Sequence, residues 1–115
     1  MINLLLPYYN KTPWNNDVLY MIWKDIEELC DPYDSNISYG GRGDSRKFSI
    51  SEWLVPEFTE ANNKIFYIHD KMYELWKKGV LGYSKSFADK LMYRMLKIEG
   101  FFFAYPYYLA VVAFG

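Results

Sequence analysis

The chain has 115 residues, with 13 lysines and arginines against 14 aspartates and glutamates, a formal net charge of −1. This balance argues against a nucleic-acid-binding protein, because such proteins need a basic surface to displace counterions. The single cysteine excludes an internal disulfide, and with it a disulfide-stabilised secreted scaffold. Hydrophobic residues make up 51% of the chain and aromatic residues 21%. We therefore expect one globular domain, residues 1–115, around one core.

The N-terminal third is predicted to hold one helix. Residues 1–7 lack a basic region and their apolar run is short, so no signal peptide is expected. A helix is predicted from about Asn16 to Leu29, capped by Asn15, Asn16 or Asp17 and ended before Pro32. Its apolar residues recur at helical spacing and predict a buried stripe of Val18, Ile22, Ile26 and Leu29.

The segment from 31 to 51 is predicted to be a loop, because it is dense in Gly, Ser, Asp and Asn. Gly40, Gly41 and Gly43 fall within four positions, which favours backbone conformations that side chains forbid. Such a loop often brings its own amides and carbonyls close to a ligand. The secondary structure of residues 51–58 is left open, and one alternative is a short helical turn interrupted by Pro56.

Two long helices are predicted to follow. The first begins near Thr59 and ends at Lys78, with Gly79 just beyond it. The second begins between Ser84 and Phe87, where residues 86–89 fit a loose capping box, and Gly100 stops it. The apolar residues expected to face inward are Ala61, Ile65, Ile68, Met72 and Leu75 in the first helix, and Leu91, Met92, Met95 and Ile98 in the second.

Residues 101–115 carry no charge. A membrane-spanning helix needs roughly 20 residues, so this stretch predicts a short helix, Pro106 to Phe114, that is buried or lies at an interface. No strand pattern is convincing. The prediction is an all-α fold: a small helical domain with two antiparallel core helices, a glycine-rich loop and an apolar C-terminal helix.

Three polar residues fall in the middle of the helix predicted over 59–78. His69 is the only histidine, Asp70 follows it, and Tyr73 lies one turn further along. A second carboxylate, Asp89, begins the next helix, which the connection folds back against this one. Taken singly, each has an ordinary explanation: a lone helical histidine is usually exposed or satisfied in a core, and Asp89 serves as a capping carboxylate. Together they place a histidine, carboxylates and a phenol at one patch.

The string His69-Asp70-Lys71-Met72-Tyr73 resembles the HDxxY signature of the phospholipase A2 superfamily. Ala88-Asp89 follows it by about twenty residues, and Tyr39-Gly40-Gly41-Arg42-Gly43 before it is similar to the YxGxG calcium loop. The layout looks like the short, disulfide-free phospholipase A2 domain of parvovirus capsid proteins, over about half the chain. Together with residues 110–115, the same core is also similar to a family of short phage proteins of unassigned function.

The resemblance implies a calcium-dependent phospholipase A2-like acyl hydrolase. His69 would act as general base on a water molecule, as a neutral imidazole can near pH 7. Asp89 would accept a hydrogen bond from the other ring nitrogen, and Tyr73 would hold Asp89 in place. The amide of Gly41 would help to hold the developing oxyanion.

The resemblance also implies a Ca²⁺ site. Calcium prefers six to eight oxygen ligands, including backbone carbonyls and carboxylates. The carbonyls of Tyr39, Gly41 and Gly43 would supply three of them, and the carboxylate of Asp70 one or two.

The implied setting is a virus or phage particle acting on the host envelope, which predicts a location in the virion or the host cytoplasm. The expected partners are a phospholipid or membrane surface and other virion proteins, the latter through the aromatic C-terminus, and no nucleic acid. An alternative stays open: a non-catalytic virion structural or interaction protein in which His69, Asp70 and Asp89 bridge two helices. Eight aromatic residues either form a lipid-facing rim or are core and subunit contacts: Trp53, Trp76, Phe101, Phe102, Phe103, Tyr105, Tyr107 and Tyr108.

Overall fold

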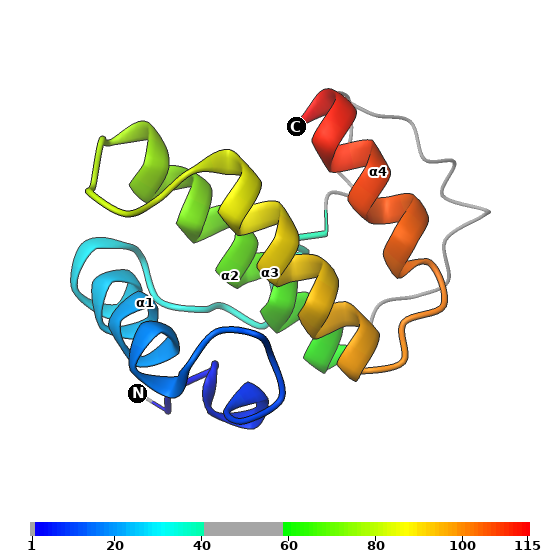
Figure 1. Ribbon diagram of the computed structural model, residues 1–115, viewed down its shortest axis with the longest axis horizontal. Helices are drawn as coiled ribbons and strands as arrows, with labels where there is room; N and C mark the ends of the chain where they lie inside the picture. Colours follow the sequence, from blue (N-terminus) through cyan, green and yellow to red (C-terminus); the bar gives the residue numbers. More distant parts are fainter. Residues whose placement is uncertain (1, 41–58) are drawn as a thin grey trace.

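The computed structural model describes residues 2–40 and 59–115 (Figure 1). Over these ranges the chain is all-helical and contains no strand, which confirms the predicted fold class. The elements are a short 3₁₀ turn, η1 (Leu6–Tyr8), and four helices: α1 (Asn16–Leu29), α2 (Glu60–Lys77), α3 (Lys85–Ile98) and α4 (Ala104–Phe114).

Helices α2 and α3 form the centre of the molecule and lie side by side in Figure 1. Thr59 caps α2: its side chain accepts a hydrogen bond from the Asn62 amide, and the Asn62 side chain accepts one from the Thr59 amide. At the other end, Gly79 has φ +79°, a left-handed conformation that glycine adopts without strain. The short connection then returns the chain antiparallel to itself. The residues of α2 predicted to face inward are buried, apart from the half-buried Ala61.

Helix α3 begins within the predicted range, but its N-cap differs from that of the predicted capping box. Ser84, rather than Ser86, is the N-cap, and its side chain accepts from the amide of Phe87. Asp89 therefore lies in the second turn and is buried, so its interpretation as a capping carboxylate is wrong. The cause is that a Ser recurs at positions 84 and 86, and spacing alone does not decide which one caps the helix.

Two residues expected in the core are exposed. Leu29 and Ile98 end their helices and face solvent, while Leu19 and Trp23 complete the buried face of α1 and Leu96 completes that of α3. Terminal residues of a helix extend past the partner that would cover them, so periodicity overestimates their burial.

The C-terminal helix α4 begins two residues before the predicted start. Ala104, Tyr107 and Val111 are buried, and α4 packs mainly against α3. In the described part of the chain, no helix combines the length and apolar character needed to cross a membrane.

The segment that precedes the glycine-rich region is fastened to two helices. Asn63 of α2 accepts a hydrogen bond from the amide of Tyr39 at 2.8 Å and donates one to the carbonyl of Ile37 at 2.8 Å. The hydroxyl of Tyr107 on α4 donates to the carbonyl of the buried Gly40. The predictions for Gly41, Gly43, Trp53 and residues 51–58 lie outside the described residues.

Candidate functional site

The antiparallel pairing of α2 and α3 brings His69 and Asp89 together. His69 Nε2 lies 2.7 Å from Asp89 Oδ1, a hydrogen-bonding distance. The His69 side chain is 11% exposed and the Asp89 side chain 2%. Twenty residues separate the two in sequence, and the turn between the helices makes them neighbours across the α2–α3 interface.

Tyr73 joins the same carboxylate from one turn further along α2. Its hydroxyl donates a hydrogen bond to Asp89 Oδ1, and its ring lies against the imidazole, with centroids 4.3 Å apart. Burial raises the pKa of the Tyr73 phenol well above its ordinary value, and the hydrogen bond to Asp89 raises it further. Tyr73 therefore remains a neutral donor at any physiological pH.

A lysine that sequence reasoning missed completes the cluster. Lys85, one turn before Asp89 on α3, places its Nζ 3.0 Å from Asp89 Oδ2. The i, i+4 spacing of Lys85 and Asp89 is the signal in the sequence that indicates this ion pair. A capping role for Asp89 hides the signal, because a capping carboxylate needs no lysine partner.

The three donors decide the charge of Asp89. Burial acts to raise the pKa of this carboxyl, but hydrogen bonds from His69, Tyr73 and Lys85 outweigh it and hold the pKa below its usual value. Asp89 is thus a buried carboxylate that stays ionised at neutral pH.

The second ring nitrogen of His69, Nδ1, has no hydrogen-bond partner in the part of the chain that the structure describes. Because Nε2 faces an ionised carboxylate, the neutral imidazole carries its proton on Nε2. Nδ1 then presents a lone pair. An imidazole oriented in this way can accept a proton from a water molecule, and Asp89 can stabilise the imidazolium that results.

Of the four predicted calcium ligands, the structure describes Tyr39 and Asp70. Tyr39 is held at the N-terminal half of α2, where its ring contacts that of Tyr67 with centroids 5.0 Å apart. Asp70 lies on the same side of α2, one turn beyond Tyr67. Tyr39 thus packs against α2 and Asp70 belongs to that helix, but no described contact joins Tyr39 to Asp70.

The chemistry of Asp70 fits a cation ligand in one respect and opposes it in another. Its carboxylate is 54% exposed and so is accessible. The ammonium group of Lys71 lies 3.5 Å from it, however, and would compete with a metal ion. Residues 2–40 and 59–115 contain no group of three or more His, Cys, Asp or Glu side chains suited to hold a metal. The calcium site stays a prediction that depends on Gly41 and Gly43.

The predicted aromatic rim divides into core and surface. Phe101 and Tyr107 are buried core residues, so for these two residues the alternative of core contacts is confirmed and a place in a lipid-facing rim is excluded. Phe103 and Tyr108 are half-buried. Phe102, Tyr105 and Trp76 are exposed, Phe102 by 85%. The exposed aromatic rings at residues 102 and 105 continue into an apolar face of α4 that also contains Leu109 and Val112.

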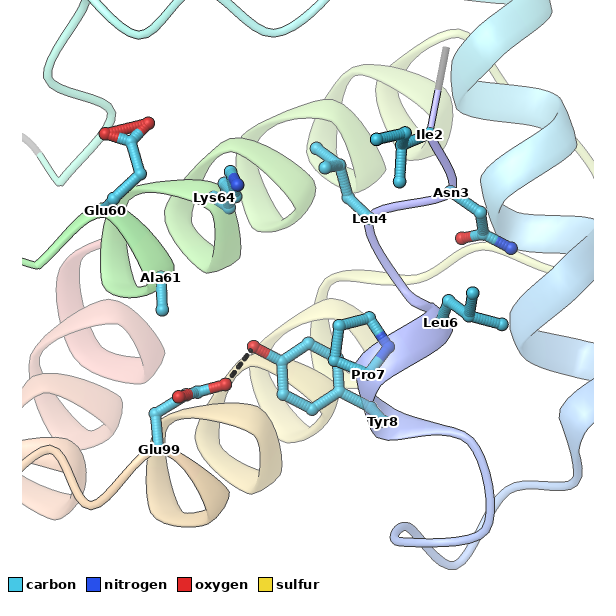
Figure 2. Close-up of a pocket in the computed structure, with 10 residues that line it drawn as sticks. All are labelled: Ile2, Asn3, Leu4, Leu6, Pro7, Tyr8, Glu60, Ala61, Lys64 and Glu99. Atoms are coloured by element: carbon cyan, nitrogen blue, oxygen red, sulfur yellow. Dashed lines mark hydrogen bonds between the residues drawn. The ribbon is translucent and has the colours of Figure 1, made fainter.

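A cavity of about 390 Å³ lies at the opposite end of the α2–α3 pair (Figure 2). The N-terminal segment, the first turns of α2 and the end of α3 form it. Tyr8 and Glu99 meet at its edge through a 2.8 Å hydrogen bond. No pattern in the sequence indicates this cavity, and neither His69 nor Asp89 lines it.

Comparison of the chain with protein-family models, with curated proteins and with solved structures finds no match. Any functional conclusion therefore depends on the geometry of the site and on the residues that form it.

Proposed function

We propose that this protein is a phospholipase A2-like acyl ester hydrolase in which His69 activates a water molecule. The observation that supports this most directly is the orientation of His69. Nε2 is 2.7 Å from an ionised, buried carboxylate, and Nδ1 is left without a partner among the described residues. This is the arrangement that a general base needs before it meets a substrate.

In the proposed reaction, Nδ1 of His69 takes a proton from water while the water oxygen attacks the acyl carbonyl carbon. The imidazolium keeps its other proton on Nε2 and donates a hydrogen bond to Asp89, whose negative charge stabilises the imidazolium. When the tetrahedral intermediate collapses, the C–O ester bond breaks and His69 returns a proton to the leaving alkoxide. The products are a fatty acid and a lysophospholipid, and Tyr73 keeps Asp89 aligned throughout.

Calcium is part of this proposal. Asp70 would hold it together with the carbonyls of Tyr39, Gly41 and Gly43, with Lys71 turned away from Asp70. A calcium ion bound there would supply positive charge for the phosphate group and the oxyanion.

The proposed partner is a phospholipid surface. The exposed apolar face of α4 adjoins α3 where the ring of Tyr93 contacts those of Tyr105 and Tyr108. Lys97 lies over the Tyr93 ring, 5.4 Å from its centroid. An apolar face with a lysine at its border suits the boundary between lipid headgroups and acyl chains. The proposed setting is a virus or phage particle, where the same face would also suit other virion proteins.

A second candidate function has its own supporting observation. The carboxylate of Asp89 accepts hydrogen bonds from both α2 and α3, and Lys85 also contacts α4. A buried polar network of this kind can fix how helices pack without performing any reaction. The protein would then be a non-catalytic structural or interaction component of the particle.

Fatty-acid release from mixed phospholipid micelles separates the two candidates. The wild type is assayed with Ca²⁺ and with a chelator, alongside His69→Ala and a control, Glu99→Gln, which changes a carboxyl group at the far end of α3. The hydrolase predicts calcium-dependent release that falls by about 10²-fold or more in His69→Ala and is unchanged in the control. A folded wild type that releases no fatty acid at any calcium concentration would instead support the structural candidate.

A further inference from the structure

Lys85 contacts two parts of the molecule at once. Its Nζ lies 3.0 Å from Asp89 Oδ2, 2.8 Å from the carbonyl oxygen of Val111 and 3.3 Å from that of Val112. The side chain is 25% exposed, so these contacts are only partly screened by solvent. One ammonium group therefore joins the carboxylate beside His69 to the last turn of α4.

The contact with α4 has a general physical reason. The last carbonyls of a helix lack partners within the helix and carry partial negative charge. Lys85 supplies a donor to the carbonyl of Val112 and a second donor to that of Val111, which also accepts from the Gly115 amide, and its charge interacts favourably with the helix dipole. Lys85 is thus a C-terminal cap for α4 that belongs to a different helix.

A second contact brings the end of α4 against the same cluster. The amide of Gly115 donates to the carbonyl of Val111 at 2.8 Å. A Cβ atom built at position 115 would lie 2.9 Å from the hydroxyl oxygen of Tyr73 and closer still to the Val111 carbonyl. The last residue therefore lies close to the Tyr73 hydroxyl, a larger side chain there would clash first with the Val111 carbonyl, and the end of α4 approaches both Tyr73 and Lys85.

We propose that Lys85 is a positioning residue that couples the docking of α4 to the alignment of Asp89 beside His69. The catalytic consequence depends on the proposed hydrolase function, but the coupling itself does not. Displacing α4 would free Lys85 from its two carbonyls and change its hold on Asp89. Conversely, a substitution of Asp89 would weaken the contact of Lys85 with α4, although Asp89 itself forms no hydrogen bond with that helix.

Amide hydrogen exchange in the full-length chain tests the coupling without any need for activity. In Lys85→Met, the amides of residues 104–114 should exchange about tenfold faster or more, as expected when a charge-assisted contact is lost. Lys85→Arg should retain most of the protection, because arginine can reach the same oxygens. Lys90→Met is the matched control, since Lys90 is an exposed lysine of the same helix and should leave α4 unchanged.

The decisive variant is Asp89→Asn, with Glu99→Gln as its control. Coupling predicts faster amide exchange in α4 for Asp89→Asn and an unchanged exchange rate for Glu99→Gln. Unchanged exchange in α4 for Asp89→Asn would overturn the proposal and leave Lys85 as a helix cap alone. Far-ultraviolet circular dichroism of each variant identifies any that has lost its fold, and Lys85→Arg then provides the remaining comparison.

A kinetic arm applies once hydrolysis is established. Lys85→Met should lower kcat about tenfold, because alignment of the base is disturbed, whereas a change confined to KM would point to altered lipid contacts of α4 instead. Lys85→Arg should recover most of kcat. If the wild type proves inactive, the hydrolase proposal fails, and the exchange measurements still decide whether Lys85 couples α4 to Asp89.

Discussion

The two ends of the α2–α3 pair carry the same interaction in different surroundings. At one end the Tyr73 hydroxyl donates to Asp89, and at the other the Tyr8 hydroxyl donates to Glu99 at 2.8 Å. Asp89 is 2% exposed and also accepts from a histidine and a lysine. Glu99 is exposed and lies beside a cavity of about 390 Å³ (Figure 2).

The difference shows that this cavity and the oriented imidazole lie in different parts of the molecule. A large apolar pocket is the usual first choice for a ligand site, and here that choice would select the Glu99 end. The residues around that cavity include two glutamates and a lysine but no histidine. The only oriented imidazole lies at the other end, so the two ends are best compared by matched substitutions.

The largest expected difference is in stability. Asp89→Ala leaves His69, Tyr73 and Lys85 without their common acceptor, and removing one member of a buried charged network costs about 3–5 kcal/mol. Glu99→Ala removes an exposed partner and should cost about 1 kcal/mol or less. Urea unfolding of the two variants measures both values. Similar losses would show that the Asp89 cluster is no more stabilising than a surface contact.

The pH dependence of stability should single out the Asp89 end. Because the folded-state pKa of Asp89 is lowered, its ionised form stabilises the fold at pH values above the unfolded-state pKa of about 3.9. That contribution is lost as pH falls through the lower, folded-state value. The difference in unfolding free energy between wild type and Asp89→Asn should be constant near neutrality and shrink below about pH 4. Urea unfolding at a series of pH values checks this, and a gap that widens in acid would contradict it.

The paired tyrosines give a smaller contrast. Tyr73→Phe removes a hydrogen bond to a buried carboxylate and should cost about 1.5–3 kcal/mol, whereas Tyr8→Phe should cost about 0.5–1.5 kcal/mol. Thermal unfolding of both variants, with identical changes in side-chain volume, provides the measurement. A larger loss of stability in Tyr8→Phe than in Tyr73→Phe would reverse the predicted order of the two ends.

The smallest effect should come from filling the cavity. Figure 2 shows the methyl group of Ala61 directed toward Tyr8 and Glu99. Ala61→Leu should raise the unfolding free energy by up to about 1 kcal/mol, because it adds apolar contacts without disturbing a hydrogen bond. Fatty-acid release should not change. A loss of release would place the acyl chain in this cavity and overturn the separation of the two ends.

Much of the fold follows from local signals in the sequence. Thr59 caps α2 where the pattern indicated, and the turn after α2 uses Gly79 as expected. The antiparallel α2–α3 pair then brings His69 next to Asp89, because a short connection leaves few alternatives. The catalytic roles of His69, Asp89, Tyr73 and Gly41 stay predictions.

Other features depend on tertiary contacts that no local pattern encodes. Lys85 looked like an ordinary helical lysine, since its carbonyl partners lie 26 and 27 residues away. Phe101 and Tyr107 could not be separated from Phe102 and Tyr105, because an uncharged segment gives no sign of which side faces the core. The cavity arises where the N-terminal segment meets two helix ends, and it has no sequence signature.

Helix α4 holds two distant parts of the chain at the same time. Tyr107 holds the carbonyl of Gly40, and the carbonyls of Val111 and Val112 hold Lys85. A proteolytic cut in the turn between α3 and α4, followed by dissociation of α4, would therefore remove one of the two attachments of residues 37–40 and both carbonyl partners of Lys85. The fold concentrates both contacts in the eleven residues of α4, so limited proteolysis at that turn measures how far the α2–α3 pair depends on this helix.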